Sequence, residues 1–182
     1  MQLLQIDLQN AQYWDPCPKW KELHVRRTEI VQRLAQAKIP DHQPAVPVSL
    51  LSQLSSAFAL ADISTALALV PKIAGLGNGL TPAGDDFLMG AMHAAWIIHS
   101  PDIATSLTSE ITTAAAPLTT SLSAAWLKSA ARGEAGILWH EFFDALISGN
   151  TEDIQNAMNK ILAVGETSGA DALAGFLDLL KR

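Results

Sequence analysis

The chain has 182 residues, of which 49% are hydrophobic and only 16% are charged, and its formal net charge is −6 at pH 7. This acidic balance argues against nucleic acid or an anionic membrane surface as the main partner, because both repel a negatively charged protein. The single cysteine, Cys17, excludes an intramolecular disulfide and a zinc cluster built from cysteines.

The shortage of charge and the amino-terminal sequence have further consequences. An ordinary domain carries roughly 25% charged residues, so this chain is expected to bury surface against other protein subunits or a second copy of itself. The amino terminus lacks the basic and apolar regions of a signal peptide, and the apolar run 87–98 is shorter than the roughly 20 residues of a spanning helix. We therefore predict a soluble, cytoplasmic protein with no membrane partner.

Apolar residues recur three and four positions apart along most of the chain, which predicts helices rather than sheets. The predicted fold class is mainly α, a multi-helix globular domain with a central apolar helix, and residues 1–182 are expected to form one domain. Leu3, Ile6 and Leu8 could form one short amino-terminal strand. In chain order, the predicted helices are 19–37, 49–60, 62–73, 82–98, 103–115, 119–131, 136–147, 151–164 and 168–180.

Residues typical of helix ends support these boundaries. Asp62 and Thr151 are predicted N-caps, since their side-chain oxygens can accept a hydrogen bond from an amide of the first turn. Gly133 and Gly165 are predicted C-caps, and a turn is predicted at 149–150.

The most informative stretch is the glycine-rich segment GLGNGLTPAGDD at residues 75–86. Alternate glycines permit positive φ angles, and Thr81 followed by Pro82 predicts a helix start with proline at the first helical position. The amides and partial positive charge of such a start can hold a phosphate or carboxylate without lysine or arginine. The predicted substrate-binding residues of this segment are Gly77, Asn78, Gly79, Leu80, Thr81 and Gly84.

Asp85 and Asp86 are the catalytic candidates of this segment. Two adjacent carboxylates at the start of an apolar helix are costly to bury unless the helix dipole, backbone donors, a cation or a ligand compensates them. The alternative is that both only complement the dipole and cap the first turn. Gly90 and His93 follow on the same helical face as Asp86. His93 is therefore a candidate for substrate binding, and the alternative is a core histidine beside a glycine that permits a close helix crossing.

A second segment, GETSGADALAG at residues 165–175, repeats the pattern Gly-x-Asp-x-Leu-x-Gly found at residues 84–90. The alignment places Asp86 on Asp171 and suggests two helix starts that face one polar pocket. Asp171 is accordingly the third catalytic candidate, and the further substrate-binding candidates are Thr167, Ser168 and Gly169. Capping of the helix by Ser168 and Asp171 is the alternative.

Arg132 is the one basic residue assigned to the site. It lies in the segment SLSAAWLKSAARGE at residues 121–134. A guanidinium can pair with a carboxylate or phosphate through two parallel hydrogen bonds, so Arg132 could contact an anionic substrate. The alternative is a solvated helix end.

Three segments, GLGNGLTPAGDDFLMG, SLSAAWLKSAARGE and GETSGADALAG, resemble the AllH-like family, formerly a domain of unknown function. The resemblance extends from about Trp14 onward. It implies a subunit of oxamate carbamoyltransferase in allantoin degradation, a branch of purine catabolism. It further implies a complex of unlike subunits that transfers a carbamoyl group between carbamoyl phosphate and oxamate, with oxalurate cleaved by phosphate in the catabolic direction. Relatives are longer at the amino end, so this chain would be a shorter variant or lack that region.

Three functions therefore stand side by side. The first is a carbamoyltransferase-type subunit that binds carbamoyl phosphate, oxamate, oxalurate or phosphate at the two helix starts. The second is a non-catalytic subunit in which the same residues form a junction with a catalytic partner. The third is a hydrolase that uses Mg²⁺ bridging the aspartates of both segments. The residues fix no cofactor and no metal ligand set. Mg²⁺ is a possible ion in the third hypothesis, and in the first hypothesis Asp85 or Asp86 orients the substrate or a cation.

Overall fold

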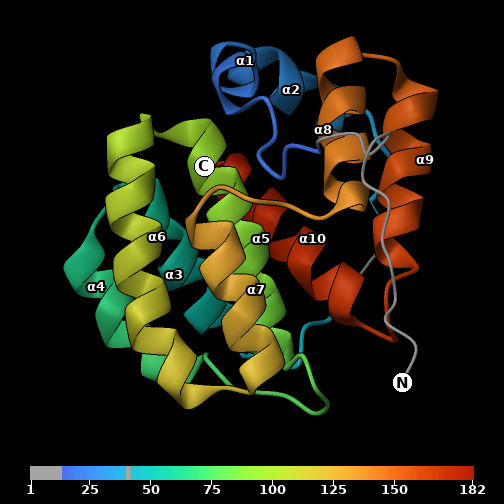
Figure 1. Cartoon of the computed structure of the whole chain (residues 1–182). Coiled ribbons are helices and arrows are strands. Elements are labelled where there is room, and N and C mark those ends of the chain that lie inside the picture. The colour runs from blue at the N-terminus through green and yellow to red at the C-terminus, as the bar shows by residue number, and fades with distance from the viewer. Residues whose placement is uncertain (1–13, 40–41) are drawn as a thin grey trace, which may run out of the picture.

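Helices account for all the regular structure of the described chain, which confirms the mainly α prediction. The computed structural model describes residues 14–39 and 42–182, and within them it contains ten α-helices and two 3-10 segments but no strand (Figure 1). The predicted strand at Leu3, Ile6 and Leu8 lies outside the described residues. The elements are α1 (Trp20–Val25), α2 (Arg27–Leu34), α3 (Val48–Ala59), α4 (Ile63–Leu69), η1 (Val70–Lys72), α5 (Ala83–Ile98), α6 (Pro101–Ala115), η2 (Ala116–Leu118), α7 (Ser121–Ala131), α8 (Ile137–Ser148), α9 (Thr151–Leu162) and α10 (Ser168–Leu180).

The predicted helix 19–37 is wrong in one respect, because the segment forms two helices. Arg26, with φ −92° and ψ 9°, leaves the helical conformation between α1 and α2. The break lets α1 pack on α5 while α2 packs on α8. Trp20 anchors α1, since its Nε1 donates a hydrogen bond to the carbonyl oxygen of Gly133 at 2.7 Å. Apolar spacing alone does not reveal a change of direction between two helices.

Helix ends lie close to the predicted residues, but several caps are displaced: the C-caps of α7 and α9 are Arg132 and Ala163 rather than Gly133 and Gly165. Asp62 is the N-cap of α4, and its side chain accepts a hydrogen bond from the amide of Thr65. The N-cap of α9 is Asn150 rather than Thr151, because the Asn150 side chain accepts from two amides of the first turn. Pro82 is the N-cap of α5 rather than its first helical residue, since its ψ of 142° is not helical. Positive φ angles occur, as predicted for helix ends and turns, at Gly133, Gly149 and Gly165.

Helices α5 and α10 cross at the centre of the fold and share its most extensive helix–helix contact (Figure 1). Glycines allow their backbones to touch. A Cβ at Gly90 would overlap the carbonyl oxygen of Ala172, and a Cβ at Gly175 would overlap that of Phe87. The contact is reciprocal, because each carbonyl lies three residues before the glycine of its own helix. Gly90 therefore serves the close crossing and does not open a notch for a ligand.

The two helix starts also make equivalent contacts, each with the segment that precedes it in the chain. A Cβ at Gly84 would overlap the carbonyl oxygen of Ile73, and a Cβ at Gly169 would overlap that of Ile161. Each of these carbonyls lies near the end of the helical segment that precedes its glycine. The repeated sequence pattern thus marks two helices whose equivalent glycines make equivalent close contacts.

An apolar cluster surrounds the α5–α10 pair, and the charge-poor middle of the sequence supplies its centre. Every residue of α5 except Met89 and Trp96 is buried. Beside α8 the cluster becomes aromatic, with ring centroids 5.6–6.0 Å apart among Trp139, Phe142, Phe143 and Phe176. No helix in the described part of the chain is long and apolar enough to span a membrane.

Candidate functional site

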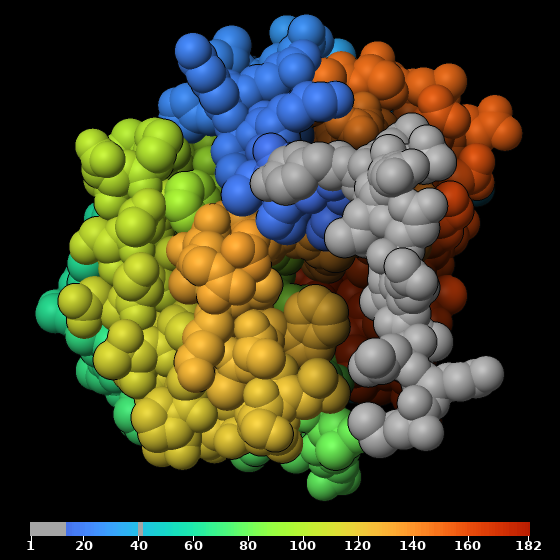
Figure 2. Space-filling model, in the orientation of Figure 1, coloured from blue at the N-terminus to red at the C-terminus, as the bar shows by residue number. Residues whose placement is uncertain are grey.

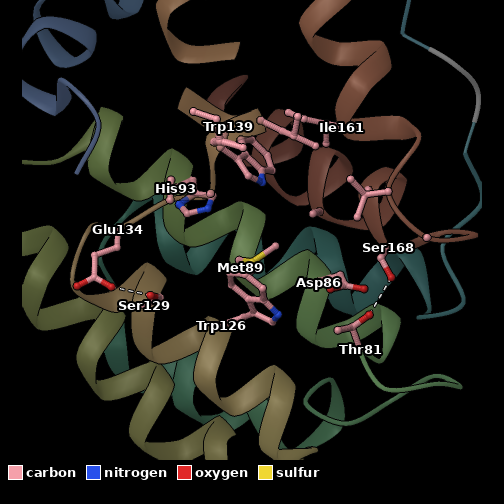
Figure 3. A pocket seen from close by; sticks show the side chains of 18 of the residues that line it. Thr81, Asp86, Met89, His93, Trp126, Ser129, Glu134, Trp139, Ile161 and Ser168 are labelled. Atoms are coloured by element: carbon pink, nitrogen blue, oxygen red, sulfur yellow. Dashed lines mark hydrogen bonds between the residues drawn. The ribbon is translucent and has the colours of Figure 1, made fainter. Parts of the chain in front are cut away.

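The starts of α5 and α10 meet at a pair of hydroxyl groups. Thr81 lies just before α5 and Ser168 opens α10, and their Oγ atoms are hydrogen-bonded at 2.8 Å (Figure 3). Thr167 is the N-cap of α10, is exposed, and makes no side-chain capping bond. Instead of forming the predicted capping pair with Asp171, the Ser168 side chain joins two segments 87 residues apart in the sequence.

A cavity of about 720 Å³ opens beside this hydroxyl pair. Figure 2 shows the surface hollowed between the gold and orange atoms of α7 and the dark red atoms of α10. Asp86 lies at one end of the cavity with Thr81 and Ser168, and Glu134 lies at the other end with Ser129 (Figure 3). Between these polar ends the wall is largely apolar, and it includes Met89, Trp126, Trp139 and Ile161.

Asp86 is the aspartate that lines this cavity. The residue is only 6% exposed, and its Oδ2 has no hydrogen-bond partner in the described structure. Burial raises the pKa of Asp86 to about 7, the hydroxyls of Ser168 and Thr81 oppose this rise, and the negative charge of Asp171 adds to it. A carboxyl with such a pKa can both take up and release a proton near neutral pH.

His93 lies on the same wall, seven residues further along α5. Aromatic rings surround it, with centroid distances of 4.9 Å to Trp139 and 6.1 Å to Trp20. Burial lowers the pKa of His93 to about 3, and its Nδ1 has no hydrogen-bond partner within the described residues. The imidazole is therefore neutral, and it offers no positive charge to an anion.

Asp85 is not among the residues that line the cavity, and it fastens two loops together. Its Oδ1 accepts a hydrogen bond from the amide of Gly75 at 2.9 Å, and its Oδ2 accepts one from the hydroxyl of Thr119. Both carboxylate oxygens are thus engaged in a residue that is 2% exposed. Asp85 holds the start of the glycine loop against the entry to α7.

Asp171 is also absent from the cavity wall. The residue is 2% exposed, and its Oδ1 lies 2.7 Å from Nε2 of His42. His42 comes from the loop between α2 and α3, and no sequence pattern had singled it out. Asp86 and Asp171 occupy equivalent positions on their helices, but the chain supplies an imidazole partner only to Asp171.

Most of the glycine loop lies outside the cavity. Among the substrate-binding residues predicted in this segment, only Thr81 contributes to the wall. The exposed residues of the loop are Leu76, Gly77, Asn78, Gly79 and Leu80. In the second segment, Ser168 and Gly169 line the cavity and Thr167 does not.

The first-turn amides of both helices are engaged by the protein itself. The amide of Gly84 donates a hydrogen bond to the carbonyl oxygen of Leu76 at 2.9 Å. In the equivalent position, the amide of Gly169 donates to the carbonyl oxygen of Val164 at 3.0 Å. These two amides, which were predicted to bind an anion, therefore donate to loop carbonyl oxygens instead.

Arg132 lies outside the cavity, whereas its partner Glu134 lies on the wall. The Arg132 guanidinium donates to the Glu134 carboxylate from Nε at 2.8 Å and from Nη2 at 2.6 Å. This pairing, together with the Ser129 hydroxyl, lowers the pKa of Glu134 to about 2. The described lining residues therefore include two acidic groups and neither lysine nor arginine.

Sequence reasoning missed several residues of the wall. Trp126, Ser129 and Glu134 all line the cavity, and all belong to the segment from which only Arg132 was chosen. Trp126 and Ser129 are three residues apart on α7 and so share one helical face. This spacing of three residues was the signal in the sequence that could have placed both side chains on one wall. Trp139 carried no such signal, because an aromatic residue on an apolar helix is usually part of the core.

The side chains do not fit the magnesium hypothesis. Among the described residues, no three His, Cys, Asp or Glu side chains gather closely enough to hold a metal ion. Asp85 is engaged by Gly75 and Thr119, and Asp171 is engaged by His42. The aspartates therefore do not converge on a common ion as that hypothesis requires.

A known protein family matches the part of the chain that contains α5, α7 and α10. Residues 73–180 match the family described as oxamate carbamoyltransferase subunit AllH. The match begins at residue 73 rather than near Trp14, so it contains both crossing helices and α7 but not α1 to α4. No solved structure matches this chain. Because the match covers more than half of the sequence, the chain belongs to the AllH family of oxamate carbamoyltransferase subunits.

Proposed function

We propose that this chain is a subunit of an oxamate carbamoyltransferase complex and that the Asp86 cavity is part of its substrate site. One observation carries the proposal: residues 73–180, which match the family, supply both helix starts and the α7 wall around Asp86. A buried acid with a raised pKa in a cavity is typical of a functional site.

The proposed reaction transfers a carbamoyl group between oxamate and phosphate. In the catabolic direction, a phosphate oxygen bonds to the carbamoyl carbon of oxalurate, and the bond from that carbon to the oxamate nitrogen breaks. The nitrogen then takes up a proton, which yields oxamate and carbamoyl phosphate. We assign this proton to Asp86, because a pKa of about 7 leaves its protonated form populated at neutral pH, and the proton that hydrogen phosphate loses in the reaction returns Asp86 to its acid form. In the opposite direction the carboxylate accepts the proton.

Phosphate binding requires cationic side chains or free backbone amides; no lysine or arginine occurs on the described wall, and the amides of Gly84 and Gly169 are engaged by loop carbonyls. Asp86 and Glu134 would repel an anion, and the nearby Arg132 is already paired with Glu134. A partner subunit that closes over the cavity is the proposed source of positive charge. The rim suits a protein contact because it exposes large apolar side chains: Trp14, Trp126, Ile137 and Val164.

A non-catalytic junction is the second candidate, and the same apolar rim favours it. In this case, Asp86 would contact a polar group of the partner rather than a substrate. The two candidates differ in what a change at Asp86 should affect: the chemical step or the assembly.

The proposal can be tested on the complex isolated from its native cell through a tag on this chain. We expect phosphate-dependent conversion of oxalurate to oxamate and carbamoyl phosphate. Asp86→Asn should lower kcat about a hundredfold with the subunits retained, because it removes a proton-transfer group. Asp153→Asn, at an exposed position on α9, is the matched control and should leave kcat unchanged.

Two results would decide against catalysis by this site. An Asp86→Asn complex with full activity would exclude the proposed proton transfer. Loss of the other subunits in the same variant would favour the junction. Recovery of the chain without any other subunit would contradict the subunit role itself.

A further inference from the structure

Asp86 lines the cavity and carries a buried carboxylate oxygen without a hydrogen-bond partner in the described structure. Its Oδ2 makes no hydrogen bond within the described structure, although the residue is 94% buried, being 6% exposed. A buried polar group without a partner destabilises the folded state, and more so if it is charged. Because the Asp86 side chain borders a cavity with room for a ligand, a donor group in the cavity can approach its carboxylate.

The other copy of the arrangement shows how the protein satisfies the same carboxylate. At the equivalent position on α10, Asp171 Oδ1 lies 2.7 Å from Nε2 of His42. An ionised carboxylate only accepts hydrogen bonds, so the imidazole nitrogen must be the donor. The partner at Asp171 is therefore a planar, nitrogen-bearing group that donates an N–H bond. The equivalent residue, Asp86, has no such partner for its Oδ2 within the described structure.

The charges around the cavity also favour an N–H donor. Glu134 is ionised and His93 is neutral, and no lysine or arginine occurs among the described lining residues. Asp171 and Asp85 add negative potential at Asp86 from the neighbouring helix and from α5 itself. An anionic end of a ligand would be repelled here, whereas an uncharged amide or a cationic amidine would not.

The apolar walls define the rest of the ligand. Met89, Trp126 and Trp139 separate the Asp86 end from the Glu134 end (Figure 3). Aromatic and thioether side chains pack well against flat, weakly polar groups. At about 720 Å³, the cavity falls in the usual range for sites that enclose small organic molecules.

We propose that the Asp86 cavity binds its ligand through an N–H donor end, a primary amide or an amidine, with the carboxylate of Asp86 as acceptor. This inference rests on the proposed function and deepens it, because it assigns the amide end of the substrate to Asp86. The anionic end then lies away from Asp86, toward the open side of the cavity. This ligand orientation is the reverse of the one expected from the sequence, in which amides at the helix start hold the anionic end.

The test compares probes of one shape that differ only in this end. Benzamide and benzamidine carry N–H donors, whereas benzoate carries an anion on the same ring. By calorimetric titration of the full chain at pH 8, we expect both donor probes to bind at least tenfold more tightly than benzoate. In Asp86→Asn the preference for benzamidine over benzoate should fall at least tenfold. Asp153→Asn is the control and should retain the preference.

A second pair of probes connects the inference to the substrate. Oxamate and oxalate differ by replacement of an amide NH₂ with an oxygen, and oxamate should bind more tightly. Equal or tighter binding of benzoate, or no detectable binding of any probe at millimolar concentration, would overturn the inference. An assembly that is active while its Asp86 site shows no donor preference would leave the subunit function standing and remove only this orientation.

Discussion

The starts of α5 and α10 are similar arrangements whose equivalent aspartates, Asp86 and Asp171, differ in their hydrogen-bond partners. In each, a glycine lets a preceding carbonyl approach the helix, and an aspartate follows two residues later. Asp171 is bonded to His42, whereas Asp86 Oδ2 has no partner in the described structure and its residue lines the cavity. A pattern repeated for helix packing can therefore leave one of its two acids available for binding.

The largest effect is expected at the crossing that makes the two copies equivalent. Gly90→Ala and Gly175→Ala should each lower the free energy of unfolding by about 3 kcal/mol, because the new Cβ would overlap a backbone carbonyl of the other helix. Intrinsic helix propensity would by itself favour alanine by about 1 kcal/mol. Urea unfolding followed by circular dichroism would measure the difference.

The control for this prediction is a glycine with free space around it. Gly136→Ala places its Cβ with nothing within 4 Å, so the free energy of unfolding should fall by no more than about 1 kcal/mol, the preference for glycine over alanine at the N-cap of α8. Increased stability of either crossing variant would show that α5 and α10 do not touch through their backbones.

Substitutions of the two aspartates should change stability in opposite directions. The pKa of Asp86 is raised from 3.8 to about 7, so the folded state holds its proton more tightly than the unfolded state. The stabilisation of the folded state by this proton is fully present below about pH 4 and is lost as the pH rises to about 7. Asp86→Asn should therefore be about 2–4 kcal/mol more stable than the native chain at pH 8, and close to it at pH 4.

Asp171→Asn should instead destabilise the fold at pH 8 by about 1–3 kcal/mol, because it weakens a buried, charge-assisted bond to His42. Urea midpoints of both variants at pH 4 and pH 8 would measure the two effects. Destabilisation of the same size by both substitutions at pH 8 would mean that Asp86 has a partner after all.

The helices were predictable because each boundary depends on neighbouring residues. Pro82, Asp62 and the glycines near helix ends act within one turn, so the observed boundaries lie close to the predicted ones. The repeated glycine pattern was also visible in the sequence. It indicated correctly that two helix starts meet, because close backbone contact requires glycine at fixed spacing.

The division of roles among the aspartates was not predictable in this way. Asp85 and Asp86 are adjacent in sequence, yet Asp85 is engaged by Thr119 and Asp86 borders the cavity. Likewise, Asp171 depends on His42, a loop residue 129 positions away. Such contacts arise from tertiary packing, and local pattern does not encode which carboxylate receives a partner.

The smallest effect is expected at the hydroxyl pair that joins the two helix starts. Thr81→Val and Ser168→Ala should each lower the free energy of unfolding by about 1 kcal/mol, because each removes one hydrogen bond. The double variant should lose less than the sum of the two, since both substitutions break the same bond. Thr113→Val is the control: its exposed hydroxyl bonds only within α6, so the change should stay below about 0.5 kcal/mol.

The same variants should also act on Asp86. The hydroxyls of Ser168 and Thr81 hold down the pKa of the Asp86 carboxyl, so removing either should raise that pKa further. NMR titration of the Asp86 side chain would measure this shift. Additive losses of stability, together with an unchanged pKa, would mean that the two helix starts do not share one polar site, and the difference between Asp86 and Asp171 would then need another cause.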